Sequence, residues 1–379
     1  MRIGIDLRML AEGKITGVEI YTLNLVRELL VIDEKNEYVL FYNSASRPLP
    51  SPLPMSWEGK NVQIINLMRS NRLLNSLMRF TGWPKVDKLL GGLDIFFSPR
   101  HSFLALSKSC KYVITVHDLS FIHEPGFFSV KSRLWHWLVS DKKAAQNATV
   151  IIAVSKSTKQ DLVKFFGIPE DRIHVVYPGV ELHNPLGQGG KSVKQKYNLP
   201  EEYILFLGTI EPRKNVEHII AAFEQTREKL NRPIGLVLAG RLGWLYKDVL
   251  KQAHASKFSN DIKFLDTITE AEKPELIKTA SLLAFVSYYE GFGFPPLEGT
   301  ASGVPVVAAM NSSIPEVMGD AVMYVNPFRV DQIAKAFETV LSDDGFRRKL
   351  IDEGLDRVKQ FTWRRTAEQT LEVFTNLKF

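Results

Sequence analysis

The amino-acid sequence predicts an α/β protein with two doubly wound domains that face a central cleft. Short apolar and β-branched runs alternate with helical patterns along the chain, which is typical of parallel sheets covered by helices on both faces. At 379 residues the chain is also too long for one hydrophobic core, since domains commonly contain roughly 100–200 residues. Ligands of such sheets bind at the carboxyl ends of the strands, which would line the cleft.

The predicted strands form two sets. The first set comprises RIGID (2–6), YVLFY (38–42), VQII (62–65), DIFFS (94–98), YVITV (112–116) and VIIAVS (150–155). The second set comprises YILFLG (203–208), GLVLAG (235–240), IKFLD (262–266), LLAFVS (282–287), PVVAA (305–309) and AVMYV (321–325). Between them lies the stretch 177–200, whose proline, glycine and polar residues are typical of a linker between domains.

The composition, with 45% hydrophobic and 24% charged residues, indicates an ordinary globular protein. The start, MRIGIDLRML, runs directly into a predicted strand and lacks the features of a signal peptide. No uninterrupted apolar stretch reaches ~18 residues, so no membrane-spanning helix is expected. Cys110 is the only cysteine, which excludes an internal disulfide and a cysteine metal cluster. Together these observations predict a cytoplasmic protein.

The net charge of +6 could serve phosphate-bearing ligands, anionic lipid headgroups or nucleic acid. The sequence has no dense Lys/Arg run of the kind that marks a nucleic-acid-binding arm, so no nucleic-acid partner is expected. Basic residues instead alternate with aromatic residues at 69–85 and 127–143. Such segments suit a membrane surface or a bulky acceptor, while an amphipathic helix with its aromatic residues in the core is the alternative.

The strongest chemical signal is EGFGFPPLE, which follows the buried run LLAFVS and places Glu290 and Glu298 eight residues apart. Glycine-rich backbone leads into a helix that begins near Pro295 and Pro296, and a helix start offers N–H groups and a positive dipole end to a phosphate. Ionised carboxylates accept hydrogen bonds from hydroxyls. A nucleotide sugar has hydroxyls on both sides of its diphosphate, so the whole string predicts a nucleotide-sugar site.

A pair of cations follows the strand that ends at Gly208. Arg213 and Lys214 suit a diphosphate, with the arginine as a fork and the lysine as a point charge. A solvated turn is the alternative. Asn215 is expected to cap the helix that follows.

Two residues of the first half are further candidates. His117 directly follows a buried strand, where it could serve as a general acid/base or a hydrogen-bond partner for substrate, or be purely structural. Gly17 stands at the start of a predicted helix, which again favours an anion.

Several motifs are absent from the sequence. No Asp-x-Asp occurs, so no carboxylate pair is available to hold Mg²⁺ against a diphosphate. The chain also has no dinucleotide-binding G-x-G-x-x-G, no Walker P-loop and no G-x-S-x-G elbow. These absences weaken the dehydrogenase, NTPase and hydrolase classes.

Taken together, the residues resemble a known family, the retaining glycosyltransferases of the GT-B class called family 4 or glycosyltransferase group 1. Its motif is a glutamate, seven residues and a second glutamate, which Glu290 and Glu298 match. The resemblance covers essentially the whole chain through TGVEIYTLNL, VHDLSF, AVSKSTKQDL, YPGV, GTIEPRKN, EGFGFPPLE, ASGVPVVA and SSIPEV. GTIEPRKN with GFGFPPLE is similar to the mannosyltransferase-like branch of polysaccharide and O-antigen assembly.

The resemblance implies two Rossmann-like domains and a C-terminal helix that crosses back to the first of them. The acceptor-binding domain would comprise residues 1–178 with the helix at 362–379, and the nucleotide-sugar-binding domain would comprise residues 179–361. Closure around donor and acceptor would be a hinge motion near the linker and this crossing.

Roles carry over by resemblance. Arg213 and Lys214 would stabilise charge on the leaving diphosphate. Glu290 would bind a hydroxyl of the transferred sugar, and His117 would lie beside that sugar. Glu298 would bind the ribose hydroxyls. The full set of implied donor-binding residues is Gly17, Thr209, Arg241, Gly291, Phe292, Gly293, Phe294, Pro295, Leu297 and Glu298. Many members have arginine where this chain has Thr209, so Arg213 would act alone there.

The implied reaction is hexose transfer with retention, without a bound metal ion or other cofactor. The expected donor is GDP-mannose, with UDP-glucose and UDP-N-acetylglucosamine as alternatives. The expected acceptor is a saccharide or a lipid-linked saccharide, with peripheral contact to the inner face of the plasma membrane. Two other classes stay open: a non-hydrolysing nucleotide-sugar epimerase, which would not be expected to carry this glutamate string, and a non-catalytic sugar-nucleotide-binding protein, which would lose the cationic pair or His117.

Overall fold

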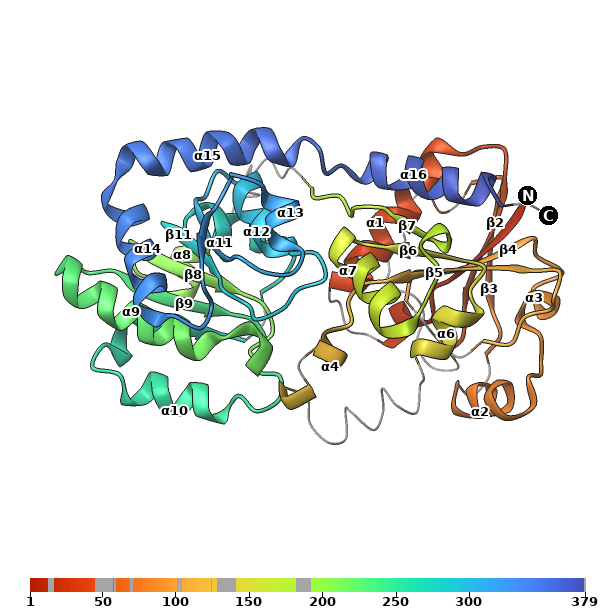
Figure 1. Cartoon of the computed structure of the whole chain (residues 1–379), viewed down its shortest axis with the longest axis horizontal. Coiled ribbons are helices and arrows are strands. Elements are labelled where there is room, and N and C mark those ends of the chain that lie inside the picture. Colours follow the sequence, from red (N-terminus) through yellow and green to blue (C-terminus); the bar gives the residue numbers. More distant parts are fainter. Residues whose placement is uncertain are drawn as a thin grey trace. The chain divides into compact units, whose positions relative to one another are not determined.

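The chain forms two compact units in the computed structural model (Figure 1). Unit 1 comprises Met1–Leu119, Val130–Gly179 and Thr362–Phe379, and unit 2 comprises Ser120–Ser129 and Val180–Phe361. The chain therefore changes unit after Leu119, Ser129, Gly179 and Phe361. The residues described are 1–12, 17–44, 57, 59–68, 71–100, 102, 104–123, 125–127, 141–181, 192–266 and 268–377.

Unit 1 is built on a seven-stranded, entirely parallel sheet in the order β3-β2-β1-β4-β5-β6-β7. The strands are β1 (Arg2–Asp6), β2 (Glu37–Tyr42), β3 (Val62–Asn66), β4 (Ile95–Ser98), β5 (Lys111–Val116), β6 (Val150–Ala153) and β7 (Ile173–Val175). The central strands are apolar on both faces, as a sheet covered by two helical layers requires. The strand order reverses between β1 and β4.

The described helices of unit 1 lie between and after these strands. They are η1 (Arg8–Glu12), α1 (Gly17–Ile32), α2 (Asn71–Thr81), α3 (Val86–Leu89), α6 (Asp141–Asn147), α7 (Lys156–Asp161), the π-helical turn η4 (Leu162–Phe166), η5 (Glu170–Arg172) and α16 (Trp363–Thr375). Thr362 caps α16 by accepting a hydrogen bond from the Arg365 N–H at 3.2 Å. Helix α16 packs on α1 and places Phe374 5.3 Å from the Phe97 ring of β4.

Unit 2 is built on a six-stranded parallel sheet in the order β10-β9-β8-β11-β12-β13. Its strands are β8 (Tyr203–Leu207), β9 (Gly235–Ala239), β10 (Ile262–Leu265), β11 (Leu282–Phe285), β12 (Val306–Ala309) and β13 (Met323–Val325). The strand order reverses between β8 and β11, and open sheets of this kind bind their ligands at the carboxyl ends beside such a reversal.

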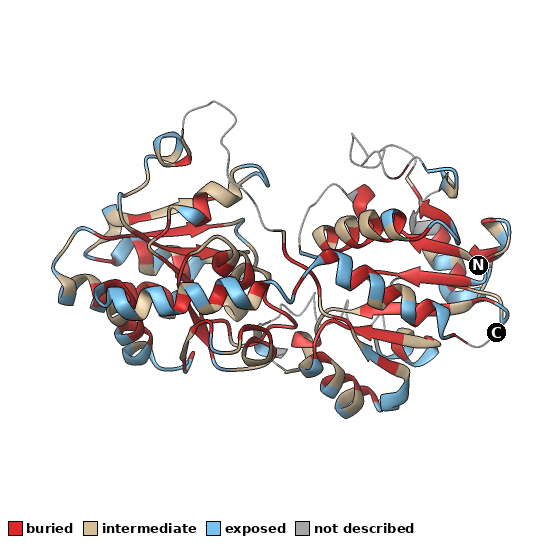
Figure 2. Ribbon diagram, turned by 90° about the horizontal axis from the view of Figure 1, so that it is seen from above, coloured by how far each residue is buried: buried red, intermediate tan, exposed pale blue. Residues whose placement is uncertain are grey.

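Helices cover both faces of this second sheet, and Figure 2 shows buried strands beside helices with exposed outer surfaces. The helical elements of unit 2 are α4 (Ser120–His123), η3 (Pro125–Phe127), α8 (Val193–Tyr197), η6 (Pro212–Lys214), α9 (Val216–Leu230), α10 (Lys247–Ala255), η7 (Ser259–Asp261), α11 (Lys273–Lys278), α12 (Phe294–Ala301), α13 (Ile314–Met318), α14 (Val330–Ser342) and α15 (Asp344–Val358). Helices α9 and α14 pack together, and Phe223 and Phe337 lie in one core cluster with Phe206 of β8.

The predicted fold class is confirmed, and each of the predicted strands corresponds to an observed one. One strand was missed, because β7 has only three residues with a buried, exposed, intermediate pattern that periodicity does not detect. The stretch expected to be a linker contains α8, which Ser192 caps through its hydroxyl. Residues 182–191 of that stretch lie outside the described residues.

Candidate functional site

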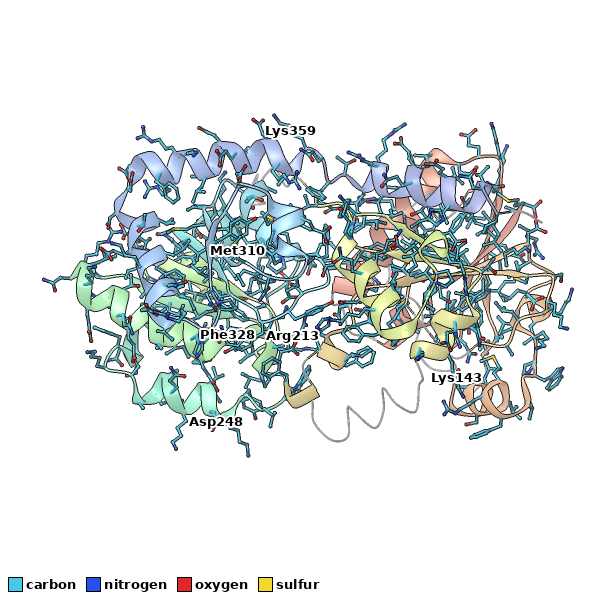
Figure 3. The ribbon with its side chains drawn as sticks, viewed as in Figure 1. Lys143, Arg213, Asp248, Met310, Phe328 and Lys359 are labelled. Atoms are coloured by element: carbon cyan, nitrogen blue, oxygen red, sulfur yellow. The ribbon has the colours of Figure 1, made fainter. Side chains whose placement is uncertain are left out.

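The polar residues of unit 2 gather at the strand-order reversal. Arg213 and Lys214 follow β8, and Glu290 follows β11, its direct neighbour in the sheet. Both segments leave the carboxyl ends of parallel strands, so residues 77 positions apart in sequence meet at one edge. Figure 3 labels Arg213 within this unit.

The Glu290 carboxylate accepts from both cations. Its Oε2 lies 3.0 Å from an Arg213 guanidinium nitrogen, and its Oε1 lies 2.6 Å from Lys214 Nζ. Only 7% of Glu290 is exposed. Burial raises the pKa of the Glu290 carboxyl, but the Arg213 and Lys214 charges outweigh it, so the pKa lies below its usual value. The carboxylate is therefore held ionised at neutral pH.

The two cations differ in how they are held. Arg213 also donates to Glu211 Oε1 at 3.0 Å and to the Tyr289 carbonyl at 3.0 Å. Lys214 has three N–H donors, and Glu290 is its one hydrogen-bond partner among the described residues. Arg213 is thus fixed in a network, whereas Lys214 keeps donors available for a phosphate.

The loop that carries Glu290 is secured by the segment between β12 and α13. The Asn311 side chain donates to the Ser287 and Tyr288 carbonyls at 3.1 and 3.0 Å. The Glu290 N–H donates to Ser312 Oγ at 3.0 Å, and the Ser313 hydroxyl donates to the Glu290 carbonyl at 2.9 Å. These hydrogen bonds between side chains and the loop backbone fix the loop without any ligand.

Helix α12 begins as the sequence predicted, with prolines in its first turn. Gly293 precedes it with φ +108°, and a Cβ there would meet Ile314 at 2.6 Å, so only glycine fits this entry into the helix. Phe292 is buried, with its ring 5.3 Å from Phe294. Leu297, predicted to bind donor, is 0% exposed, so its side chain lies in the core, and its donor-binding role stays a prediction.

Glu298 is located in α12, and its partner is a residue that the sequence analysis did not single out. Lys273, the first residue of α11, places Nζ 2.7 Å from Glu298 Oε1 and 3.0 Å from Glu270 Oε2. Burial lowers the pKa of the Lys273 ammonium, but the two carboxylates outweigh it and raise that pKa above its usual value. A single lysine at the start of a helical stretch gave the sequence analysis no signal of a site.

Thr209 and Arg241 are brought together because they follow the neighbouring strands β8 and β9. The Arg241 Nε lies 3.5 Å from Thr209 Oγ1. Close to them, Gly240 has φ +143°, and a Cβ there would meet the Gly208 carbonyl at 2.0 Å. The two strand ends therefore approach as closely as glycine backbone permits.

Asn215 does not cap α9 with its side chain, so that expectation was wrong. Its Nδ2 instead donates to the Val286 carbonyl at 3.1 Å and to the Pro327 carbonyl at 2.7 Å. The Asn215 amide thus connects the turn after β8, which carries Arg213 and Lys214, to the end of β11, which leads to Glu290.

A short segment from the first half of the sequence belongs to unit 2. His123 stacks on Tyr289 with ring centroids 4.5 Å apart, and Phe127 stacks on Tyr288 at 5.1 Å. The division at the linker had left this segment, Ser120–Ser129, in the first domain. These aromatic contacts explain why the segment belongs to unit 2. They are made to Tyr288 and Tyr289, the two residues directly before Glu290.

His117 lies at the carboxyl end of β5 in unit 1. Its Nε2 is 2.8 Å from the Pro99 carbonyl, which can only accept, so Nε2 carries the proton in the neutral ring. Nδ1 is then an acceptor that could face a hydroxyl. Burial lowers the pKa of the His117 imidazole despite the opposing effects of Pro99, Asp118 and Glu19. Gly17 begins α1 in the same unit.

Unit 1 has a second polar group that the sequence analysis missed. At the end of β1, the Asp6 carboxylate accepts two hydrogen bonds from the Arg8 guanidinium, at 2.9 and 2.7 Å, and one from the Ser102 hydroxyl at 2.7 Å. Both charged residues are buried. The signal was an acid as the last residue of the first strand and a base two residues later, in GIDLR.

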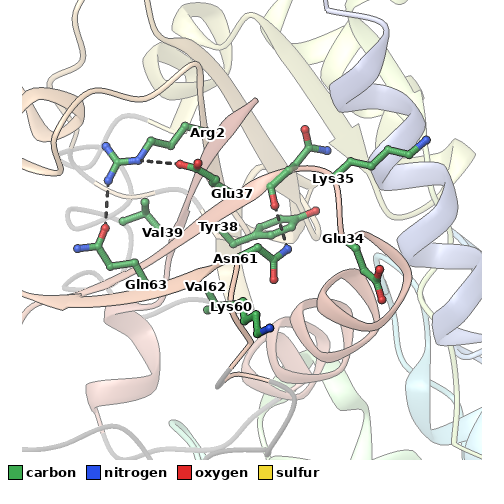
Figure 4. A pocket seen from close by; sticks show the side chains of 11 residues that line it. Arg2, Glu34, Lys35, Glu37, Tyr38, Val39, Lys60, Asn61, Val62 and Gln63 are labelled. Carbon is green, nitrogen blue, oxygen red and sulfur yellow. Dashed lines mark hydrogen bonds and ion pairs between the residues drawn. The ribbon is translucent and has the colours of Figure 1, made fainter.

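A pocket of about 400 Å³ lies elsewhere in unit 1 (Figure 4). Arg2, Glu37 and Val62, the first residues of β1, β2 and β3, contribute to its lining. It is thus at the amino ends of these strands, whereas ligands of doubly wound sheets bind at the carboxyl ends. This pocket is not the candidate site.

Two kinds of feature are absent from the described residues. In that part of the chain, no group of three or more His, Cys, Asp or Glu side chains could hold a metal ion. No described helix is long and apolar enough to cross a membrane.

One test of the His117 environment is stability against pH. Its lowered pKa means that the folded state resists protonation, so unfolding becomes easier as pH falls below about 6.5, the usual histidine value. We expect the thermal midpoint to fall less between pH 7.5 and 5.5 in His117→Asn than in the wild type. An equal fall of the thermal midpoint in both proteins would show that His117 does not cause the loss of stability at low pH.

The two parallel-sheet, Rossmann-like units give the chain the two-domain fold called GT-B, which the solved structures that it resembles share. Residues 15–184 match the family described as Glycosyltransferase Family 4, and residues 191–357 match Glycosyl transferases group 1. The chain belongs to this family and is a glycosyltransferase, as the sequence resemblance predicted.

The chain is also similar to individual relatives and solved structures. The chain is 28% identical to O-antigen chain mannosyltransferase B of Escherichia coli over 95% of this chain and 96% of that protein. It is 32% identical to the serotype-specific mannosyltransferase WbdA of Escherichia coli over 61% of this chain, but that match spans only 29% of WbdA. The solved structure of Anabaena HepE in complex with UDP and glucose is similar in fold, with a TM-score of 0.74, 20% identity and full coverage of both chains.

Proposed function

We propose that this enzyme transfers a hexose, with mannose from GDP-mannose as the first choice, to a saccharide or lipid-linked saccharide acceptor in surface polysaccharide assembly, with retention at the anomeric carbon. The observation that carries the proposal is the contact of Glu290 with Arg213 and Lys214 at the strand-order reversal of unit 2. The mannosyltransferase relatives support the sugar. HepE, solved with UDP and glucose, supports UDP-glucose as the alternative donor.

The proposed roles follow from charge and position. When the bond between the anomeric carbon and the phosphate oxygen breaks, negative charge grows on the leaving diphosphate, and Lys214 and Arg213 would stabilise it. Glu290 would hold a hydroxyl of the transferred sugar, and Glu298 would hold the ribose. Backbone N–H groups from Gly291 to Pro295 would lie along the sugar and its phosphate. His117 would accept a hydrogen bond from the sugar.

The test is a product assay of the purified protein with GDP-mannose, UDP-glucose and UDP-N-acetylglucosamine, each with and without a saccharide acceptor. Transfer to acceptor supports the proposal and identifies the donor. An epimerised nucleotide sugar without acceptor would instead make the protein an epimerase. Binding of nucleotide sugar without any product would make it a non-catalytic binding protein.

We further propose that catalysis needs no metal ion. The sequence has no Asp-x-Asp, and the cations of Lys214 and Arg213 already supply the charge that Mg²⁺ supplies to a diphosphate elsewhere. Activity should therefore survive millimolar EDTA unchanged. A loss of activity that Mg²⁺ or Mn²⁺ restores would contradict the proposal.

Peripheral membrane contact is a separate proposal, for the basic and aromatic segment at 69–85. Phe80 is 81% exposed and Trp83 is 63% exposed. The alternative interpretation of this segment placed its aromatic rings in the core, and these two rings are not there. Arg79 and Lys85 lie beside them in the sequence. Residues 128–140, most of the companion segment 127–143, lie outside the described residues.

Vesicle flotation tests this contact. The wild type should bind vesicles that contain anionic lipid and should release them at high salt, since each Lys or Arg near such a surface contributes about 1 kcal/mol. Phe80→Ser with Trp83→Ser should weaken binding, whereas Leu355→Ser, an exposed apolar residue of α15, should not. Binding that is independent of anionic lipid would end the proposal.

A further inference from the structure

The pairing of Lys273 with Glu298 is a polar feature of unit 2 to which neither the sequence motifs nor the roles above assign a function. The lysine is fixed between two carboxylates, Glu298 Oε1 at 2.7 Å and Glu270 Oε2 at 3.0 Å. Its side chain is only 12% exposed, and that of Glu298 is 15% exposed, whereas that of Glu270 is 55% exposed. Helices α11 and α12, which carry Lys273 and Glu298, pack against each other.

This position is unfavourable for a lysine on local grounds. Lys273 is the first residue of α11, where the helix dipole disfavours a positive charge. Burial of the ammonium adds a desolvation cost, which the two carboxylates offset. A local preference that is overridden in this way points to a role beyond the helix itself.

The hydrogen-bonding capacity of the pair is incompletely used. An ammonium has three donors, and among the described residues two carboxylates take two of them. Glu298 Oε2 likewise receives no hydrogen bond from the described residues, since Lys273 binds Oε1. The ion pair therefore offers a hydrogen-bond donor on Lys273 Nζ and, next to it, a hydrogen-bond acceptor on Glu298 Oε2.

A vicinal diol matches that arrangement. Each hydroxyl can donate and accept, so one hydroxyl of a ribose can donate to Glu298 Oε2 while its neighbour accepts from Lys273 Nζ. A carboxylate without the lysine could accept a hydrogen bond from either hydroxyl, so it would not require that both be present. Because the two groups are largely shielded from water, losing one hydroxyl would leave a polar atom poorly paired.

We propose that Lys273 is a specificity-determining residue of the donor site: together with Glu298 it binds the 2′- and 3′-hydroxyls of the nucleotide ribose and selects ribonucleotide over 2′-deoxyribonucleotide donors. The inference rests on the proposed function, in which Glu298 faces the ribose. The part added here is the lysine and the selection that follows from it.

Calorimetry with two matched pairs of nucleotides tests the selection: GDP against 2′-deoxy-GDP, and UDP against 2′-deoxy-UDP. For the base that the wild type accepts, the ribonucleotide should bind about 10–100-fold more tightly than its deoxy analogue. In Lys273→Met this ratio should fall towards one, chiefly because the ribonucleotide binds more weakly. Lys273→Arg, which keeps the donor and the charge, should retain part of the preference.

The control is Lys278→Met, which removes an exposed lysine from the last turn of the same helix and should leave the ratio unchanged. The double variant Lys273→Met/Glu298→Gln guards against misfolding, because it leaves no buried charge unpaired; it should melt near the wild-type midpoint and show no ribose preference. An unchanged ratio in Lys273→Met, or an equal loss for both nucleotides, overturns the inference while the proposed function stands. Failure of the wild type to bind any of the four nucleotides would count against the proposed function itself.

Discussion

Lys214→Met should lower kcat by about 10²–10³-fold in a protein that still folds. Lys214 is the cation whose donors are available to a phosphate, and one preorganised donor of this kind is typically worth about 3–4 kcal/mol in the transition state. Folding should survive because Arg213 still pairs with Glu290 after the change. Steady-state kinetics and thermal unfolding of the same preparation measure both effects. Near-normal turnover in this variant would show that Lys214 does not stabilise the leaving diphosphate.

The matched change at the neighbouring cation should behave differently. Arg213→Ala should lower kcat as well, but it also leaves the buried carboxylate of Glu211 without its cation. Breaking a buried pair in this way commonly costs about 3–5 kcal/mol of stability. The thermal midpoint should therefore fall far more in Arg213→Ala than in Lys214→Met. Equal midpoints would mean that the two cations are held alike.

The two glutamates should separate binding from turnover. Glu298→Gln should weaken nucleoside diphosphate binding by about 1.5–3 kcal/mol, because its hydrogen bonds to ribose would exist in ground and transition states alike. Glu290→Gln should mainly lower kcat, because charge at the anomeric carbon develops only in the transition state. The nucleoside diphosphate should bind the Glu290 variant at least as well as the wild type, since the neutral amide leaves Arg213 and Lys214 without their counter-charge.

Calorimetry with the nucleoside diphosphate, alongside kinetics, decides between the two roles. Glu270→Gln is the matched control, because Glu270 shares Lys273 with Glu298 but its side chain is 55% exposed. It should change neither affinity nor turnover by more than a few-fold. The reverse ranking of the two main variants would mean that the acids have exchanged roles.

The sequence predicted most of the fold because parallel strands buried on both faces leave uninterrupted apolar runs. It missed β7, which is too short to show a pattern. Contacts between distant segments were beyond it for a physical reason: local propensity says nothing of a partner 70 or more residues away. Asn215 illustrates this, since a cap is its local preference and its actual acceptors are the Val286 and Pro327 carbonyls.

The residues of the candidate site likewise fall into those that the sequence could predict and those that it could not. Arg213, Lys214 and Glu290 could be predicted because each lies in the segment that leaves the carboxyl end of a strand, and such strand ends converge. Their direct contact with one another could not, since the spacing along the chain is the same whether or not the side chains pair. Lys273 lies in the helix after β10 and further from its strand than the other three residues, so its position gave no such signal. Leu297 was placed in the site by the motif around it, although its helical position turns the side chain into the core.

Helix α16 gives the chain an unusual order of assembly during synthesis. A ribosome makes residues 1–179 first, and domains commonly fold in the order in which they emerge. Here the early unit still lacks the helix whose Phe374 packs against Phe97 and whose Thr366 hydroxyl donates to the Tyr177 carbonyl at 2.9 Å. Unit 2 has its last residue, Phe361, before that helix is translated. Unit 1 begins before unit 2 along the chain but is completed after it, and until then the face of α1 that packs on α16 would lack its cover.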